Sequence, residues 1–202
     1  MENITFDFQT EHILENDCVK LLPLTADNFT PLVHFTADEP EIWFYSPAPL
    51  TNAEDMKAYF KLTIDRREKQ KDYAFLVYDK RTEQFAGSTR FYDIDLENCS
   101  LKIGYTWYGK NFQGTGLNKH CKLLLLTFAF DTLGFERVMF EANAQNERSI
   151  AAMKSIGCAV EGILRHFTRN SNGTWRDTIV LSILKEEWEK GGREKLAGKC
   201  FL

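Results

Sequence analysis

Residues 113–118, with the sequence Gln-Gly-Thr-Gly-Leu-Asn, combine residue types from which proteins build phosphate-binding loops. Glycine has no Cβ and adopts positive φ readily, so Gly114 and Gly116 allow successive backbone N–H groups to converge on one point. A helix that begins directly after such a loop adds unpaired N–H groups and a partial positive charge. The spacing therefore predicts an anion site, and we expect a phosphate-bearing cofactor in it.

The segments on each side of this loop must hold it in place. Upstream, Leu101, Ile103, Tyr105 and Trp107 alternate with polar or small residues, which predicts a strand over 101–107. Downstream, residues 117–133 predict a helix. Two familiar phosphate loops are excluded: a Walker loop has Lys and then Ser or Thr after its last glycine, and a dinucleotide loop has a third glycine.

The loop resembles the acyl-CoA loop of the GCN5-related N-acetyltransferases, Gln/Arg-x-x-Gly-x-Gly/Ala, with Gln113, Gly116 and Asn118 at the three defined positions. Asn118 departs from the general pattern and is similar to a variant of the RimJ/RimL-type ribosomal-protein branch. The resemblance implies that acetyl-CoA is the co-substrate. Its pyrophosphate would bind Gln113, Gly114, Thr115, Gly116, Leu117 and Asn118.

A second segment carries the same resemblance. Residues 137–142 predict a strand, and Asn146 and Ser149 stand before a short helix that Gly157 ends, similar to the family's Asn-x-x-Ser/Ala-(x)7-Gly segment. The resemblance implies that Asn146 reaches the pantetheine arm of acetyl-CoA. The residues alone leave a second interpretation open, because Asn146 or Ser149 could simply cap the helix.

Acetyl transfer requires a neutral amine, a polarised thioester and a proton for the departing thiolate. Many members of the family use a Tyr of the short helix as the acid, whereas this chain has Met153 there. Resemblance to the RimL-type members makes Ser149 the candidate that hydrogen-bonds the thiolate. Glu141 is the first candidate for the base. Other candidates are Asp93, Asp95 and His166, and each carboxylate or imidazole could instead be an ordinary surface group.

The expected fold class is α/β of the α+β kind: a mixed, mostly antiparallel central sheet of about seven strands with helices on both faces. We expect one domain over 1–202, with 1–17 as an N-terminal extension and 185–202 as a C-terminal tail. The resemblance implies that the fourth and fifth strands splay apart and that acyl-CoA lies in the gap. Three residues, Tyr105, Thr106 and Trp107, would then flank the acetyl group through their backbone.

Individual elements follow from periodicity and turn residues. The pattern predicts a strand over 18–24, a helix beginning near Phe29, a loop over 38–50, a helix over 53–70 behind a Thr51–Glu54 capping box, strands over 73–78 and 85–92, and a hairpin of 160–169 and 175–184 turned by 170–173.

Candidates for binding the amine acceptor lie in two segments that the implied fold places near the acetyl group. They are Trp43, Phe44 and Tyr45 in the loop, and Arg165, His166, Trp175, Arg176 and Asp177 in the hairpin. An aromatic run beside prolines is also typical of a packed loop, and Arg176-Asp177 could fix the hairpin. Deprotonating an α-amine costs about 1.4 kcal/mol at pH 7 and a lysine about 4.6 kcal/mol, which favours α-amines for an enzyme without an obvious base.

Composition limits the remaining function classes. The net charge of -4 and the lack of long basic runs argue against nucleic acid, and the apolar runs are too short to cross a membrane. Five dispersed cysteines and an N-terminus unlike a secretory signal indicate a reducing cytosol. No metal-ligand spacing links the other histidines, His12, His34 and His120, so we expect no metal.

The leading hypothesis is a cytoplasmic N-acetyltransferase that moves an acetyl group from acetyl-CoA directly to an amine in a ternary complex. The acceptor would be a protein N-terminus or a small-molecule amine. A non-catalytic module that senses acyl-CoA is the alternative, because Met153 replaces the acid and no base is assured. Nucleotide binding at the same loop is a third reading. Whether the chain forms a homo-oligomer is left open.

Overall fold

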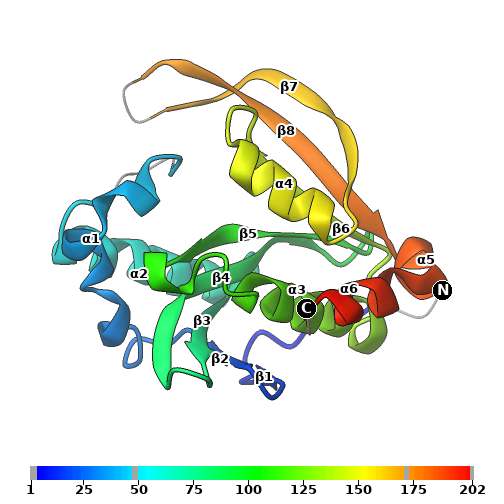
Figure 1. Ribbon diagram of the computed structural model, residues 1–202, viewed down its shortest axis with the longest axis horizontal. Coiled ribbons are helices and arrows are strands. Elements are labelled where there is room, and N and C mark those ends of the chain that lie inside the picture. Colours follow the sequence, from blue (N-terminus) through cyan, green and yellow to red (C-terminus); the bar gives the residue numbers. More distant parts are fainter. Residues whose placement is uncertain (1–3, 47–49, 171–172, 201–202) are drawn as a thin grey trace.

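The computed structural model describes residues 4–46, 50–170 and 173–200. Their strands form one sheet in the order β1-β2-β3-β4-β5-β6-β8-β7 (Figure 1). Neighbouring strands are antiparallel except β5 and β6. The strands are β1 (Leu14–Glu15), β2 (Val19–Pro23), β3 (Tyr73–Asp79), β4 (Gln84–Asp95), β5 (Ser100–Tyr108), β6 (Arg137–Asn143), β7 (Ala159–Arg169) and β8 (Trp175–Leu184). The expected mixed, mostly antiparallel sheet is confirmed, and the two-residue β1 is the addition.

Short and long helices connect these strands. They are η1 (Thr30–Leu32), α1 (Phe35–Asp38), η2 (Pro40–Trp43), α2 (Ala53–Glu68), η3 (Lys110–Phe112), α3 (Leu117–Thr127), η4 (Phe128–Thr132), α4 (Glu147–Ser155), α5 (Lys185–Glu187), η5 (Trp188–Gly192) and α6 (Arg193–Cys200). The helix expected over 117–133 is therefore α3 followed directly by η4.

Helices cover both faces of the sheet, as two successive residues of β4 show. Arg90 donates a hydrogen bond to Thr63 on α2, whereas Thr89 pairs with Thr106, which accepts a hydrogen bond from Lys122 on α3. Successive side chains of a strand point to opposite faces. Helices α2 and α3 therefore lie on opposite sides of β4 and β5.

Strands β5 and β6 separate soon after they meet. Their parallel register holds only from Ser100↔Arg137 to Lys102↔Met139, whereas β6 pairs with β8 along its whole length to Asn143. From Ile103 onward, β5 has no partner on its β6 side (Figure 1). The expected splay is present, and it leaves backbone polar groups that need other partners.

The first expected helix is broken. Residues 30–43 form η1, α1 and η2 in place of one helix, because Pro31 and Pro40 each begin a new turn and Glu39 takes a non-helical conformation before Pro40. Asn28 does not cap a helix but ties Thr25 N–H to Pro23 O. The loop expected over 38–50 thus contains helix η2, while residues 47–49 lie outside the described residues.

Two smaller expectations concern the N-cap of α2 and the turn between β7 and β8. The cap of α2 is Asn52, whose side chain accepts the N–H of Asp55, so the Thr51–Glu54 box is wrong by one position. The turn of the β7–β8 hairpin is closed by Asn170 N–H to Thr174 O, and residues 171–172 lie outside the described residues.

Residues near both ends of the described part of the chain belong to the packed structure. Phe6 and Phe8 are buried with Tyr73 in the core, and Trp188 is 1% exposed with its indole N–H bonded to Asp131. The segment expected as a C-terminal tail is helical and packs on α3 (Figure 1). Within the described part of the chain, no helix is long and apolar enough to cross a membrane.

Candidate functional site

The loop between η3 and α3 takes a conformation that requires its glycines. Gly114 has φ 77° and Gly116, which caps α3, has φ 84°. An added Cβ would meet nothing within 4 Å at either position, so backbone conformation and not crowding selects glycine there. The first turn of α3 follows directly, and its N–H groups have no intrahelical acceptors. Gly114 and Thr115 at the tip of the loop are exposed to solvent.

A guanidinium group lies against this loop. Arg81, from the turn between β3 and β4, donates to Thr115 O at 3.1 Å, and Asp79 holds it through an ion pair of 2.7 Å. The hydroxyl of Thr115 donates to Phe112 O and tightens the turn. Arg81 does not stand out in the sequence as part of this site, because it is 34 residues from Thr115 and only the fold brings the two together.

Gln113 and Asn118 are each held by defined hydrogen bonds. The amide nitrogen of Gln113 donates to Tyr108 O at 2.7 Å, and its side-chain oxygen accepts from Arg148 at 2.7 Å. The hydroxyl of Tyr108 donates to Asn118 Oδ1 at 3.1 Å. These bonds tie the loop to the end of β5 and to α4, so the loop has a fixed orientation across the gap between β5 and β6.

Strand β5 carries a bulge where it faces the gap. The register passes from Ser88↔Trp107 to Arg90↔Gly104, so Tyr105 and Thr106 together oppose Thr89. Tyr105 has φ 48°, a left-handed conformation that is uncommon for an aromatic residue. Its ring is 47% exposed and lies 4.1 Å from the guanidinium carbon of Arg90. The bulge turns backbone groups of β5 away from regular pairing at this point.

On α4, the structure separates the two interpretations of Asn146 and Ser149. Asn146 is the N-cap, with its side-chain oxygen 3.1 Å from the backbone N of Ser149. Ser149 lies inside the first turn, and within the described chain its hydroxyl has no recorded hydrogen-bond partner. Met153 is buried on the same helix. Asn146 therefore caps α4, and the hydroxyl of Ser149 takes no part in the cap, so it can bind another partner.

The candidate bases differ in their surroundings. Glu141 accepts from Lys102 at 2.7 Å, and Asp93 lies 3.1 Å from the same ammonium. Burial of Lys102 is opposed by these carboxylate hydrogen bonds, which raise its pKa. Asp95 binds Asn98 in a turn, and hydrogen bonds from Asn98 lower the pKa of Asp95. Each of these three carboxylates is already engaged.

The expected loop 43–45 does contact the gap region, but its aromatic residues differ in exposure. Trp43 is 5% exposed and packs edge-on against Trp107 at 4.7 Å, so it is a core residue. Tyr45 donates its hydroxyl to Gln145 O at 3.2 Å and accepts from Arg176 through its own carbonyl at 3.3 Å. Tyr45 thus joins the loop to the N-terminal side of α4 and to β8.

The hairpin presents the other acceptor candidates. His166 has φ 50°, its N–H is held by Asp177 at 2.8 Å, and its ring stacks on Trp175 at 5.9 Å. Arg169 lies 4.0 Å from the centre of the same Trp175 ring. Asp177 therefore fixes a bulge of β7. The indole of Trp175 contacts both the imidazole of His166 and the guanidinium of Arg169.

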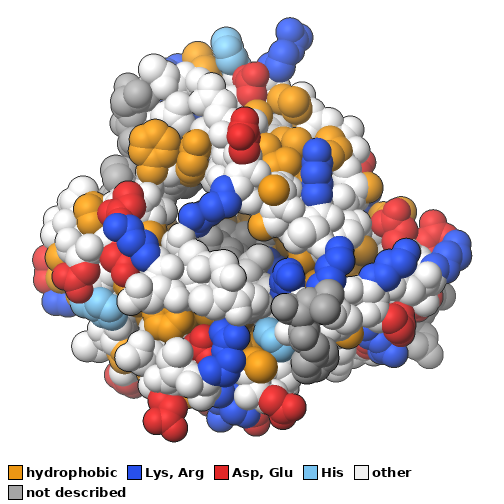
Figure 2. Space-filling model, viewed as in Figure 1, with side chains coloured by type: hydrophobic (Ala, Val, Ile, Leu, Met, Phe, Trp, Pro, Cys, Tyr) orange, Lys and Arg blue, Asp and Glu red, His pale blue; other side chains and the backbone are white. Residues whose placement is uncertain are grey.

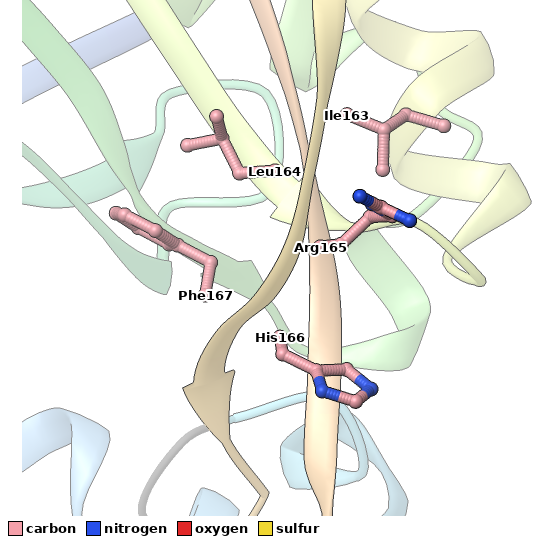
Figure 3. Close-up of a pocket in the computed structure, with 5 residues that line it drawn as sticks. All are labelled: Ile163, Leu164, Arg165, His166 and Phe167. Carbon is pink, nitrogen blue, oxygen red and sulfur yellow. The ribbon is translucent and has the colours of Figure 1, made fainter.

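A surface cavity with a volume of ≈ 600 Å³ lies along the bulge of β7 and is lined by five residues of that strand. They are Ile163, Leu164, Arg165, His166 and Phe167 (Figure 3). In Figure 3, Leu164 and Phe167 project to one side of the strand and Ile163 and Arg165 to the other. Three of the five are large apolar side chains, which makes this strand an apolar surface beside the hairpin's charged groups.

The space-filling view shows the surface hollowed between α3 and the α4–hairpin layer, with blue Lys and Arg side chains around the hollow (Figure 2). The hydrogen bond from Arg148 to Gln113 brings the first turn of α4 against the glycine loop, and β5 and β6 are unpaired beyond Lys102 and Met139. Within the described residues, no three metal-binding side chains cluster. The described features are a glycine turn at the N-terminus of α3, a strand edge of β5 without a partner and a serine hydroxyl on α4.

Comparison with known proteins agrees with this geometry. The family model described as "Acetyltransferase (GNAT) domain" matches residues 19–159. The curated protein "Uncharacterized N-acetyltransferase p20" of Bacillus licheniformis is 26% identical over 151 residues, 74% of this chain and 84% of that protein. The protein named "Putative ribosomal N-acetyltransferase YdaF" of Bacillus subtilis (strain 168) is 35% identical over 116 residues, 57% of this chain and 61% of its own length.

Among solved structures, a GCN5-related N-acetyltransferase from Brucella melitensis has a TM-score of 0.85 at 24% identity, covering 94% of this chain and 86% of that one. The ribosomal-protein-S5-alanine acetyltransferase from Vibrio fischeri has a TM-score of 0.72 at 17% identity, covering 88% and 99%. At these identities the likeness concerns the fold. This shared fold is the expected α/β architecture, over 94% and 88% of the chain.

Proposed function

The chain belongs to the acetyltransferase (GNAT) family and is an N-acetyltransferase; from this premise we propose that it uses acetyl-CoA to acetylate a primary amine by direct transfer in a ternary complex. The acceptor that we favour is the α-amino group of a protein N-terminus. The name of YdaF suggests a ribosomal protein as the source of that amine, which would place the reaction in the cytosol.

The loop fits the pyrophosphate of acetyl-CoA. Positive φ at Gly114 and Gly116 brings backbone N–H groups together at the N-terminus of α3, where the helix dipole favours negative charge. Arg81 adds a cation at Thr115, and Arg148 adds another at Gln113. Arg148 would help to balance the charge of a diphosphate, whereas Arg81, which is already paired with Asp79, would support the loop backbone.

The splay fits the pantetheine arm. Beyond Lys102 the backbone of β5 has no strand partner on its β6 side, so its N–H and C=O groups are available to the amide groups of that arm. Asn146 and Ser149 stand at the start of α4, which follows β6, one of the two strands that separate. In a fully paired sheet, β6 would form hydrogen bonds with these N–H and C=O groups of β5. A ligand that carries two amides and a terminal thioester would take its place as their partner.

Bound acetyl-CoA supplies an activated acetyl group, whose carbon forms a bond to the acceptor nitrogen as its bond to sulfur breaks. The chain contributes polar groups where charge changes. Backbone N–H groups of the bulge at Tyr105–Trp107 polarise the acetyl carbonyl, and the hydroxyl of Ser149 donates to the departing sulfur. The proton lost by the amine passes to solvent, because Glu141 is held by Lys102.

Acceptor recognition is assigned to the hairpin and to loop 43–45. Trp175, with His166 stacked on it, offers an exposed aromatic surface, and Tyr45 stands where loop, α4 and β8 meet. Trp43 keeps a supporting role, since it is buried against Trp107. We place the acceptor peptide between these segments.

The observation that carries the proposal is the end of β5–β6 pairing at Lys102 beside the positive-φ glycine loop. A direct test measures CoA thiol release from acetyl-CoA with three acceptors: a peptide with a free N-terminus, an aminoglycoside and a polyamine. Thiol release that requires the peptide, and an acetylated peptide N-terminus by mass spectrometry, would support the proposal. Release with the polyamine alone would contradict the choice of acceptor.

Met153 stands where the family resemblance implies a Tyr that acts as the general acid, which suggested a non-catalytic acyl-CoA sensor; the family match disfavours that alternative. That reading predicts that the purified protein binds CoA tightly and releases no thiol with any amine. Binding measured in the same preparations as turnover separates the two functions.

A further inference from the structure

Lys122 is an ammonium group in the middle of an apolar helix face. It lies on α3 beside Cys121, Leu125 and Leu126, all of which are buried, and Lys122 itself is only 5% exposed. Among the described residues, Lys122 Nζ donates a hydrogen bond to Thr106 Oγ1 at 2.9 Å, and no carboxylate forms an ion pair with it. Burying a charge without an opposite charge costs several kcal/mol. A leucine or methionine would fill this position without that cost.

The ammonium lies where β5 and β6 have already separated. Thr106, its hydrogen-bond partner, is on β5, and the ring of Phe140, 5.9 Å from Nζ, is on β6. The last paired residues of these strands are Lys102 and Met139. Lys122 on α3 therefore contacts both separated strands, on either side of the gap that is proposed above to hold the pantetheine arm.

Thr106 links this ammonium to the bulge. An ammonium only donates, so Thr106 Oγ1 accepts from Lys122, and its own hydrogen must go to Thr89 Oγ1 at 2.7 Å or Gly104 O at 3.4 Å. The donated hydrogen bond of Lys122 thus fixes the direction of the Thr106 hydroxyl, at the bulge whose backbone is proposed to flank the acetyl group.

We propose that Lys122 is a positioning residue for acetyl transfer: through Thr106 it orients the β5 bulge, and its positive charge stabilises the negative charge that develops on the acetyl carbonyl oxygen and then on the leaving sulfur. This inference rests on the function proposed above. Lys122 forms no covalent bond in the step. The new bond joins amine nitrogen and acetyl carbon, the carbon–sulfur bond breaks, and the thiolate is protonated.

Among Lys122 and the groups that face it, Lys122 is the one whose charge changes near pH 8. Burial lowers the pKa of Lys122 to about 8. Cys121 on the same helix and Cys158 before β7 are the titratable groups against it, and burial raises the pKa of each thiol to about 12. Thr106 and Phe140 do not titrate. Between pH 7 and 10, a loss of charge at this place is therefore a loss of charge on Lys122.

The test compares Lys122→Met, Lys122→Gln and the exposed-lysine control Lys61→Met in acetylation of a free-N-terminus peptide between pH 6.5 and 10. In the unmodified protein, kcat should rise as the acceptor amine loses its proton and fall above about pH 8. Both Lys122 variants should lose about tenfold or more in kcat with the KM for acetyl-CoA within twofold, and the fall above pH 8 should disappear. Lys61→Met should match the unmodified protein.

Each other outcome decides the question as well. Glutamine keeps a donor for Thr106 but no charge, so full activity in Lys122→Gln would overturn the role of the charge. If Lys122→Met does not fold, Lys122→Gln and the pH profile of the unmodified protein carry the test, and a kcat that stays level from pH 8 to 10 would overturn the inference. An unmodified protein that releases no thiol with any amine would overturn the proposed function too, whereas an active one with unaffected Lys122 variants would overturn this inference alone.

Discussion

The guanidinium of Arg148 on α4 donates a hydrogen bond of 2.7 Å to the side-chain oxygen of Gln113. The bond joins the two sides of the cleft, because Gln113 belongs to the loop before α3 and its amide nitrogen is anchored on Tyr108 O at 2.7 Å. It is an exposed contact and contributes little to folding. Its value is that it holds a cation and a polar side chain together where a diphosphate would bind.

Arg148→Met should therefore weaken CoA binding by about fivefold, or ~1 kcal/mol, because one charged donor is lost and Gln113 becomes free to rotate. Isothermal titration with CoA measures the change. Lys154→Met, at the other end of α4, is the matched control and should bind CoA normally. Equal CoA affinities in the two variants would place the diphosphate away from Gln113.

Gly116→Val tests the loop itself. Gly116 has φ 84°, and a side chain there would meet no neighbour within 4 Å, so the substitution acts through backbone strain of about 1–2 kcal/mol. We expect at least a tenfold loss of CoA affinity in a protein that still unfolds cooperatively. The matched control is Gly162→Val on β7, where a Cβ also has open space and no positive φ is required. Unchanged CoA affinity in Gly116→Val would defeat the placement of the pyrophosphate.

Asn146 and Ser149 can be separated by paired substitutions. Asn146→Ala removes the N-cap of α4 and should cost about 1 kcal/mol of unfolding free energy. Ser149→Ala should change stability by less than about 0.5 kcal/mol, because the serine contributes only its backbone N–H to the cap. If its hydroxyl donates to the departing sulfur, kcat should fall by about a hundredfold. Normal kcat with normal stability in Ser149→Ala would exclude that role.

Trp175→Ala addresses the acceptor side. The indole lies between His166 and Arg169 on the exposed hairpin, so its loss should leave the core unchanged. We expect the KM for an acceptor peptide to rise about fivefold, in line with ~1 kcal/mol for an exposed aromatic contact, while the KM for acetyl-CoA stays constant. Leu62→Ala, an exposed apolar side chain on α2, serves as control. A change in the KM for acetyl-CoA alone would move Trp175 to the cofactor side.

What the sequence could predict was local. The glycine loop, the Asn146 segment and the order of strands follow from spacing within a few residues, so they could be predicted without knowledge of distant packing. One helix expected near Phe29 was wrong, because Pro31 and Pro40 divide it into short turns. The cap of α2 shifted by one residue, since Thr51 and Asn52 are both good caps and only the backbone path decides between them.

The groups that complete the candidate site could not be predicted, because they arrive from distant segments. Arg81 reaches Thr115 across 34 residues, and Arg148 reaches Gln113 across 35. The ion pair that occupies Glu141 depends on Lys102 of the neighbouring strand β5, whose partner in the register is Met139, two residues before Glu141. In the sequence, Lys122 is one lysine before an apolar run, and its burial follows only from the packing of α3 against Thr106 of β5 and Phe140 of β6.

That burial leads to a stability prediction that does not depend on catalysis. The pKa of Lys122 is lowered to about 8 by burial, against about 10.4 for an unfolded lysine. Below pH 8 the folded protein must bury a charge that the unfolded chain keeps in water, which costs roughly 3 kcal/mol. Between pH 8 and about 10.4 the unfolded state binds the extra proton, so this group's contribution makes stability rise with pH.

Lys122→Met should therefore be more stable than the unmodified protein at pH 7, by up to roughly 3 kcal/mol, and the difference should shrink as the pH approaches 10.4. Urea unfolding of both proteins at pH 7, 8.5 and 10 measures it, with Lys61→Met as the variant that should show no pH-dependent difference. A residue kept only for packing would show the opposite sign at pH 7. A gain in stability at pH 7 together with a lower kcat would mean that the chain retains a costly buried charge for its chemistry.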